Sequence, residues 1–176
     1  MKASAALWLG IALVLSVELA HAEKPLKDYS FIRGVHYGIY GDQATLERDL
    51  GYDKRINLNS TRIWLSYKAY ETDPQGYIER LRNYIRTANR MGITTMPILW
   101  NGNDLKPESL KPAFHAEGSA YVKAIVEAVK DEPGLLMWDI MNEPFWNDYY
   151  NKATSDEKQQ HAAEITAFVR YYLTFC

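Results

Sequence analysis

The fold is decided by the stretch Leu135-Leu-Met-Trp-Asp-Ile-Met-Asn-Glu-Pro144. Its first part, Leu135 to Met141, is apolar except at Asp139. A strand that is apolar on both faces is typical of a parallel sheet that is covered on both sides. The stretch therefore predicts a buried strand from Leu135 to Met141, with two polar residues, Asn142 and Glu143, directly after it.

Strand and helix patterns alternate on both sides of this stretch. The other expected strands are Phe31 to Tyr37, Thr61 to Ser66 and Ile93 to Trp100. The expected helices are Asp42 to Ile56 (with Leu46, Leu50 and Ile56 as core contacts), the segment from Asp73-Pro74 to Met91, Ser119 to Lys130, and one that Ser155 caps and that runs toward Phe175. This alternation predicts an α/β fold made of four parallel βα units.

The helix that begins at Asp73-Pro74 carries the clearest signals. Asp at the N-cap followed by Pro at the first helical position is a strong start signal. Gly92 follows the last apolar position and is typical of a helix C-terminus. The apolar residues between these limits keep helical spacing, and they are Tyr77, Ile78, Leu81, Tyr84, Ile85, Ala88 and Met91. We expect them to face the core.

The N-terminus is typical of a secretory signal peptide over residues 1–22. Lys2 precedes an apolar run from Ala5 to Val17, and Ala20-His21-Ala22 fits the small-x-small cleavage rule. The apolar run is too short for a membrane span, although an uncleaved anchor is the alternative interpretation. We therefore expect a mature chain from Glu23, a secreted or periplasmic location, and no membrane partner after cleavage.

The composition excludes some partners and favours others. The formal net charge is -2, and nothing indicates nucleic acid or an anionic membrane surface. The chain has 13 Tyr and 5 Trp, and such rings serve either as stacking surfaces for sugars or as core residues. The single cysteine, Cys176, cannot form an internal disulfide. The histidines have no metal-ligand spacing, so we expect no metal and no cofactor.

Polar and aromatic residues stand at the ends of the expected strands. They are His36 and Tyr37, Arg62, Trp100 and Asn101, and Asn142 and Glu143. Function gathers at the carboxyl ends of strands in parallel barrels. Glycoside hydrolysis needs a proton donor beside the leaving oxygen and a second carboxylate. Glu143 is suited to the donor role and Asn142 to a hydrogen bond with a sugar hydroxyl.

The chain resembles the retaining glycoside hydrolases of clan A, and most of all family 5, which contains cellulases and mannanases. The resemblance runs from Phe31 to Pro144. It rests on Arg33-Gly-Val-His-Tyr37, Asn59-Ser-Thr-Arg-Ile-Trp64, Met91-Gly-Ile93 and Trp138-Asp-Ile-Met-Asn-Glu-Pro144. It implies a TIM (β/α)₈ barrel of which residues 23–176 hold the first four βα units. It also implies cleavage of a β-linked glycan, of the β-glucan, mannan or xylan type.

The resemblance also implies roles for the catalytic candidates. Glu143 resembles the general acid/base, and Asn142 resembles the residue that contacts the substrate 2-hydroxyl. Arg62 resembles the arginine that supports the catalytic carboxylates, and a structural ion pair inside the barrel is the alternative.

Further strand-end residues resemble substrate contacts. His36 and Tyr37 match a substrate-binding strand end, and a buried structural histidine is the alternative for His36. Many family 5 members have a histidine where this chain has Trp100-Asn101. Trp100 is either a sugar platform or a cap on the barrel, and Trp146 would line the subsite beyond the scissile bond.

Asp139 stands too far from Glu143 to be the second catalytic carboxylate. Four residues along a strand span roughly 13 Å, whereas the carboxyls of a retaining pair are roughly 5–5.5 Å apart. We expect a structural role for Asp139, with a basic or amide partner.

The family places its nucleophile, a Glu, at the end of strand seven, and only four strands are expected here. We therefore expect a chain that stops after its fourth helix, is inactive alone, and self-associates through exposed half-barrel edges. The alternatives are a non-catalytic carbohydrate-binding half-barrel and an inactive gene fragment.

Overall fold

The computed structural model describes residues 28–39 and 41–176. Contacts divide the chain into one unit from Met1 to Ser30 and another from Phe31 to Cys176. In the first unit, the backbone amide and hydroxyl of Ser30 donate to the carboxylate of Asp28. The signal peptide expected over residues 1–22 lies outside the described residues.

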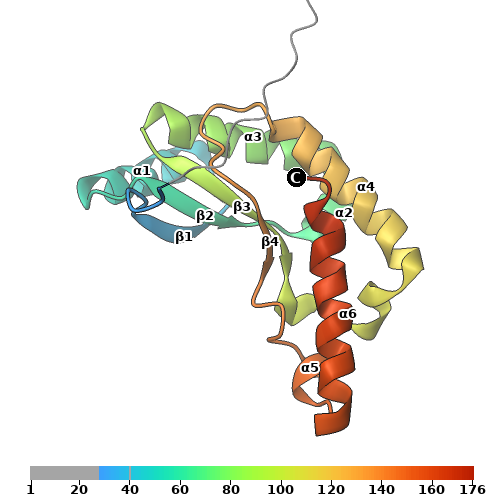
Figure 1. Cartoon of the computed structure of the whole chain (residues 1–176). Coiled ribbons are helices and arrows are strands. Elements are labelled where there is room, and N and C mark those ends of the chain that lie inside the picture. The colour runs from blue at the N-terminus through green and yellow to red at the C-terminus, as the bar shows by residue number, and fades with distance from the viewer. Residues whose placement is uncertain (1–27, 40) are drawn as a thin grey trace, which may run out of the picture. The chain divides into compact units, whose positions relative to one another are not determined.

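The second unit is built on one parallel sheet whose strands follow chain order, β1-β2-β3-β4 (Figure 1). The strands are β1 (Gly34–Gly38), β2 (Ser60–Trp64), β3 (Thr94–Asn101) and β4 (Asp139–Asn142). His36 is in register with Arg62, and Asn101 with Asn142. The α/β class and the parallel βα units are thus confirmed.

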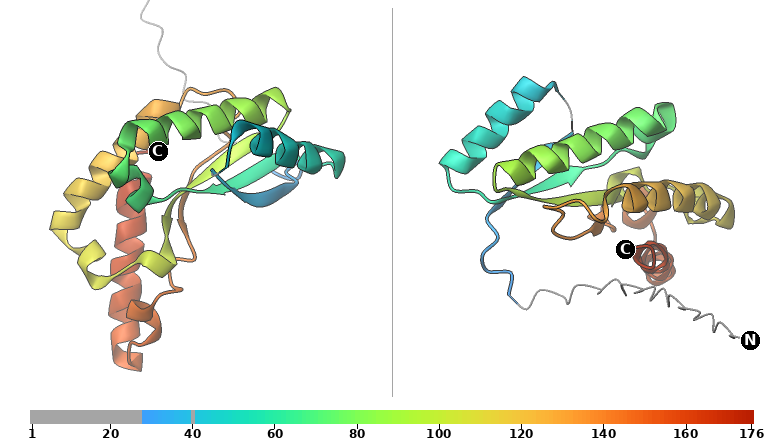
Figure 2. Two further views of the ribbon diagram at one scale, coloured as in Figure 1. Left: turned by 180° about the vertical axis from the view of Figure 1, so that it is seen from behind. Right: turned by 90° about the horizontal axis from the view of Figure 1, so that it is seen from above.

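Helices connect the strands and cover the sheet. They are α1 (Gln43–Arg55), α2 (Tyr67–Thr72), α3 (Pro74–Arg90), α4 (Pro112–Val129), α5 (Asp148–Asn151) and α6 (Ser155–Leu173), with the 3₁₀ turns η1 (Gly102–Asp104) and η2 (Pro107–Leu110). In Figures 1 and 2 the long helices α3, α4 and α6 form an arc around the strands. None of the helices in the described part of the chain is long and apolar enough to cross a membrane.

The hydrophobic core lies between the sheet and this arc of helices. It takes apolar side chains from every long helix and from the strands, among them Leu46, Leu50, Ile63, Leu81, Ile85, Leu99, Val122, Ile125, Ile165 and Phe168. All seven apolar positions expected in the helix after Asp73 are buried or packed against this core. The prediction for α3 is therefore confirmed.

The predicted limits of α3 are confirmed by its capping. Asp73 is the N-cap, and its carboxylate accepts a hydrogen bond of 3.0 Å from the Gly76 amide. Pro74 is the first helical residue, where its missing N–H costs nothing. Gly92 follows the helix with φ of 76°, a left-handed conformation that favours glycine.

The first strand begins at Gly34 and not at Phe31. The side chain of Asn59 accounts for the difference, because its amide donates to the Phe31 carbonyl and its oxygen accepts from the Arg33 amide. The Arg33 carbonyl also accepts from the backbone amides of Asn59 and Ser60, so the chain contacts the start of β2 before Gly34 without forming a regular ladder. The second strand ends at Trp64 and not at Ser66, because Ser66 caps the unpredicted helix α2.

The fourth strand was predicted from Leu135 but begins at Asp139. Leu135 forms only an isolated bridge with Thr95, and the chain rejoins the sheet four residues later.

Three helix predictions also needed correction. Helix α4 begins at Pro112, seven residues before the predicted Ser119, because Pro is well suited to a first helical turn. Thr154, not Ser155, caps α6 through a reciprocal pair with Glu157. Ile56 was expected in the core but is 70% exposed, since it lies beyond the last turn of α1.

Candidate active site

Arg62 on β2 joins three of the four strands at the carboxyl end of the sheet. Its Nε donates to Asp139 Oδ2 at 2.9 Å, and its Nη2 forms an ion pair with the same oxygen. Nη2 also donates to Asn142 Oδ1 at 3.0 Å, and Nη1 lies 3.0 Å from His36 Nε2. The Arg62 guanidinium therefore links a side chain of β1 to side chains of β4.

The donors of Arg62 determine how its neighbours are oriented. A guanidinium only donates hydrogen bonds, so His36 Nε2 must accept and the proton of the neutral ring lies on Nδ1. For the same reason Asn142 presents its oxygen to Arg62. Its amide nitrogen is then 3.4 Å from both Asn101 Oδ1 and Glu143 Oε2. Arg62 thereby directs the Asn142 amide toward Glu143.

The structure assigns Asp139 the role expected for it. It pairs with the basic partner Arg62, and its second oxygen accepts from the Met141 amide at 3.1 Å. The prediction of a structural role with a basic or amide partner is confirmed. Both alternatives weighed for Arg62 are compatible, because the same ion pair holds the Asn142 side chain in place.

Glu143 begins the turn that leaves β4. It has φ of 45°, a left-handed conformation that is uncommon for a residue with a side chain. Its carbonyl accepts from the Trp146 amide at 2.9 Å, and the buried Asn147 donates to the Pro144 carbonyl at 2.8 Å. The sharp change of direction thus begins at Glu143, one residue before Pro144. The Glu143 side chain is exposed, whereas Asn142 is buried.

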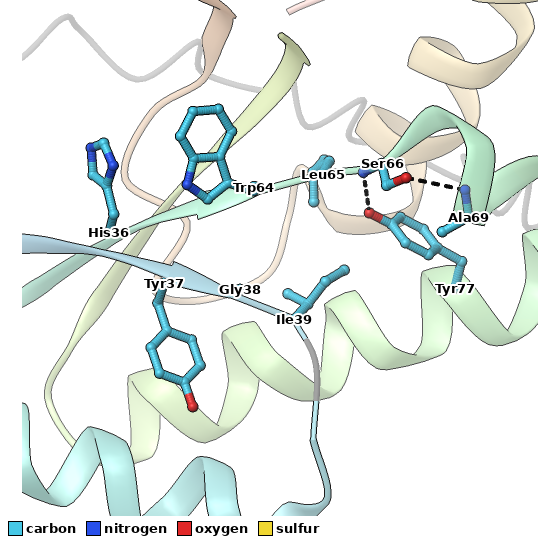
Figure 3. A pocket seen from close by; sticks show the side chains of 9 residues that line it. All are labelled: His36, Tyr37, Gly38, Ile39, Trp64, Leu65, Ser66, Ala69 and Tyr77. Carbon is cyan, nitrogen blue, oxygen red and sulfur yellow. Dashed lines mark hydrogen bonds between the residues drawn. The ribbon is translucent and has the colours of Figure 1, made fainter. Parts of the chain in front are cut away.

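Trp64 belongs to this site although the sequence reasoning did not select it. Its ring meets the His36 ring edge-on at 5.6 Å, and the Arg62 guanidinium carbon lies 5.6 Å from its centroid. It also lines a cavity of about 410 Å³ at the ends of β1 and β2, together with His36 and Ser66 (Figure 3). Residues two apart on a strand share a face, so Arg62 was the signal that could have identified Trp64.

Tyr37 is separated from His36 because neighbouring residues on a strand point to opposite faces. Figure 3 shows the two side chains on opposite sides of β1. The Tyr37 hydroxyl donates to Asp49 on α1 at 2.8 Å, and its ring is 5.7 Å from that of Tyr84. Tyr37 borders the same cavity as His36 while its hydroxyl is anchored on α1, so its role as a substrate contact stays a prediction. Arg48, and after it Tyr37, lower the pKa of Asp49 by hydrogen bonding.

Trp100 lies in the core and does not offer a platform for a sugar. Its ring is only 8% exposed, and it packs against aromatic rings from α2, α4 and α6, which are Tyr67, Phe114, Tyr121, Phe168 and Tyr172. The structure thus favours the alternative of a packing role at the end of the barrel. Its neighbour Asn101 contacts Asn142 and stays with the site.

Trp146 is the more exposed of the two aromatic residues that follow Pro144, with 65% of its surface accessible against 41% for Phe145. It lines an open cavity of about 490 Å³ between the loops after β3 and β4, together with Asn103, Lys106 and Asp148. Phe145 instead packs against Tyr150 of α5, with ring centroids 5.2 Å apart. Of the two rings, Trp146 is therefore the one that is more available to a ligand.

No family model matches the sequence. A mannan endo-1,4-beta-mannosidase of Mytilus edulis is 30% identical in an alignment of 123 residues, which covers 58% of this chain and 33% of that protein. The chain therefore spans about a third of the length of the curated relative that it matches.

Solved structures share the fold. The β-mannanase of the blue mussel Mytilus edulis matches with a TM-score of 0.56 and 25% identity, over 74% of this chain and 47% of its own. An endo-1,4-beta-mannanase from Rhizomucor miehei matches with a TM-score of 0.59 and 16% identity, over 82% and 53%. A GH5_18 protein from Bifidobacterium longum subsp. infantis matches with a TM-score of 0.57 and 13% identity, over 78% and 40%.

These matches cover about half or less of each matched chain, and the described sheet holds four parallel strands in chain order. They confirm the expected TIM barrel type of fold. The mussel protein is similar to this chain in sequence as well as in structure. The chain is thus a relative of the (β/α)₈ glycoside hydrolases of the family 5 type, and its described part corresponds to four consecutive βα units of their barrel.

Proposed function

We propose that this chain carries the acid/base half of a retaining glycosidase site for β-mannan or a related β-linked glycan. The observation that supports the proposal most is the network around Arg62, which directs the Asn142 amide toward Glu143. A paired carboxylate and amide at a strand end are the groups needed for a proton donor and for a sugar hydroxyl contact.

In the proposed reaction, Glu143 donates a proton to the glycosidic oxygen as the bond to the anomeric carbon breaks. As that bond breaks, a second carboxylate from outside these four units bonds to the anomeric carbon and forms the glycosyl intermediate. Glu143 then takes a proton from the water that attacks the anomeric carbon and frees the second carboxylate, so that it acts as acid and base in turn. Asn142 holds the sugar hydroxyl beside the reacting carbon. Arg62 and Asp139 touch no substrate in this scheme and keep the Asn142 amide in position.

The nucleophilic carboxylate of the family stands at the end of strand seven, and the described sheet has four strands. We propose that the nucleophile is not part of these four units. The chain alone would then bind a glycan at its half-site without turning it over.

Aromatic side chains are placed to contact sugars on the two sides of Glu143. Trp64 and His36 lie toward β1, where the cavity at the strand ends is open. Trp146 follows Glu143 in the loop after β4 and is exposed. Because the proton donor stands beside the leaving oxygen, we assign Trp146 to the leaving-group side.

The test combines an activity assay with a binding measurement on the full chain. Mannan, β-glucan and xylan oligosaccharides are incubated with the wild type and with Glu143→Gln, and new reducing ends are measured. We expect no turnover by either protein. Activity that Glu143→Gln abolishes would show that the chain is an enzyme by itself and would overturn the missing-nucleophile proposal.

Binding is followed by NMR titration with mannohexaose. We expect resonances of Asn142 and Trp146 to shift, and Trp146→Ala to weaken binding. Tyr52→Ala is the matched control, because Tyr52 is an exposed ring on α1, near the turn that leads to the start of β2 at the opposite edge of the sheet. Equal affinity of both variants would contradict the assignment of Trp146. Shifts with cellohexaose alone would change the substrate class.

Secretion and self-association are also proposed. Secretion is supported by the pattern of residues 1–22, and cleavage before Glu23 is tested by N-terminal sequencing of exported protein. Self-association is supported by β1 and β4 being the outer strands of the described sheet. Size-exclusion chromatography that finds a monomer at all concentrations would contradict it.

A further inference from the structure

Gly102 lies where the loop after β3 meets the end of β4. Asn101 and Asn142 are the last registered pair of the two strands, so Gly102 comes next to Glu143. A Cβ atom on Gly102 would stand 2.0 Å from the Glu143 carbonyl oxygen, 2.7 Å from its carbon and 2.9 Å from the Asn142 oxygen. These are backbone atoms, so no change of rotamer can make room for even a methyl group.

The conformation of Gly102 itself does not explain why a glycine is needed. The residue has no positive φ, and its carbonyl accepts from the Leu105 amide at 3.0 Å in an ordinary 3₁₀ turn. Any small residue could adopt this backbone. The requirement for glycine therefore comes from the contact with Asn142 and Glu143 and not from the turn.

Glu143, on the other side of this contact, has a backbone that needs outside support. Its φ of 45° is disfavoured for a residue with a Cβ. Such conformations persist where the surrounding structure holds them. The hydrogen bond from the Trp146 amide to the Glu143 carbonyl and the one from Asn147 to the Pro144 carbonyl hold one side. Gly102 packs on the other side of the Glu143 backbone.

We propose that Gly102 is a positioning residue for Glu143. Its lack of a side chain lets the loop after β3 pack on the Asn142–Glu143 peptide and hold the left-handed backbone that presents the Glu143 carboxylate next to the Asn142 amide. The name acid/base for Glu143 rests on the proposed function, but the positioning itself does not. Gly102 touches no reacting atom in this scheme.

The test is Gly102→Ala in the full chain, compared with Gly51→Ala. Gly51 lies inside α1, and a Cβ there has 3.9 Å to its nearest neighbour, the end of the flexible Arg55 side chain. NMR follows hydrogen exchange at the Trp146 amide and the chemical shifts of Asn142 and Glu143. We expect Gly102→Ala to speed exchange at Trp146 by about tenfold or more and to move the Glu143 resonances.

Amides in the middle of α3 should exchange as in the wild type in both variants, which would show that the fold is intact. Gly51→Ala should leave Trp146 and Glu143 unchanged. A folded Gly102→Ala protein with wild-type exchange at Trp146 and wild-type shifts at Glu143 would overturn the proposal.

A rescue variant keeps the test decisive if Gly102→Ala folds but is too unstable for the exchange measurement. Glycine at position 143 adopts many more backbone conformations, so its carbonyl can move away from the new methyl group. We expect Glu143→Gly to raise the unfolding temperature of the Gly102→Ala protein by more than it changes that of the wild type. An equal change in both backgrounds would show that the two positions are independent and would refute the proposal.

None of these measurements uses a substrate, so the outcome is separate from that of the proposed function. A failure of mannohexaose binding counts against the proposed function alone. If the wild type turns over a glycan, Gly102→Ala should lower kcat with KM retained, since the sugar contacts stay in place. A rise in KM at unchanged kcat would contradict positioning of the proton donor.

Discussion

Replacing Asp139 by Asn tests the network that holds the proposed site together. The Arg62 and Asp139 side chains are 19% and 21% exposed, so water screens their ion pair only in part. Asp139→Asn keeps the shape and one hydrogen-bond acceptor but removes the charge. Arg62 is then left with three neutral partners, His36, Asn142 and the new amide.

The expected loss of stability follows from the two hydrogen bonds between Arg62 and Asp139. A hydrogen bond to a charged group contributes about 1.5–3 kcal/mol and a neutral one about 0.5–1.5 kcal/mol. Two such bonds that lose their charge should therefore cost about 2 kcal/mol of unfolding free energy. This value lies between the roughly 0–1 kcal/mol of an exposed pair and the roughly 3–5 kcal/mol of a fully buried one.

Urea unfolding followed by circular dichroism measures this free energy. Asp148→Asn is the matched control, because the Asp148–Lys152 pair is 82% and 75% exposed and should give no measurable change. A double-mutant cycle with Arg62→Met then isolates the pairwise energy. If Asp139→Asn costs no more than Asp148→Asn, or if the cycle shows no coupling, the reasoning about Arg62 is refuted.

Three other contacts lead to predictions about the stability of the protein. Gly118→Ala should cost about 1–3 kcal/mol by overpacking, because its Cβ would stand 2.1 Å from the Tyr172 hydroxyl; an unchanged thermal midpoint would contradict this. Thr154→Ala removes the N-cap that pairs with Glu157 and should cost about 1 kcal/mol in urea unfolding. Burial raises the pKa of Tyr77 to about 12. A tyrosine in the unfolded chain has a pKa of ~10. The contribution of Tyr77 to the unfolding free energy is therefore complete below pH ~10 and is lost as the pH rises through the pKa of Tyr77 in the folded protein. Absorbance titration compared with Tyr77→Phe measures it, and a Tyr77 that ionises near its unfolded value would contradict the burial.

The sequence predicted most reliably those features whose signals are local. The N-cap Asp73, the Pro at the first helical position and Gly92 together located α3, because each acts within its own turn. The starts of β1 and β4 were wrong, because a strand begins where a partner is available. The Asn59 side chain bonds the Phe31 carbonyl and the Arg33 amide in place of a regular ladder. Before Asp139, Leu135 forms only an isolated bridge with Thr95.

The sequence predicted which strand ends form the site, but it predicted less well which way the side chains at those ends point. Strand alternation separated Tyr37 from His36, and packing among helices placed Trp100 in the core. Trp64 was missed although it shares a face with Arg62. Gly102 could not be selected from the sequence, because its requirement comes from Glu143, a residue far along the chain.

Two departures from local stability rules converge at the end of β4, and they support a functional site independently of any resemblance. A residue with a side chain has a left-handed backbone where glycine would be favoured, and a charged pair is largely desolvated. Such departures are expected at functional sites. Apolar residues often stabilise a protein more than the buried ion pair that they replace. We therefore expect Arg62→Met combined with Asp139→Leu to unfold at a temperature no lower than the wild type, while mannohexaose binding is lost. A double variant that is less stable than Asp139→Asn alone would show that the ion pair is kept for stability and not for a functional site.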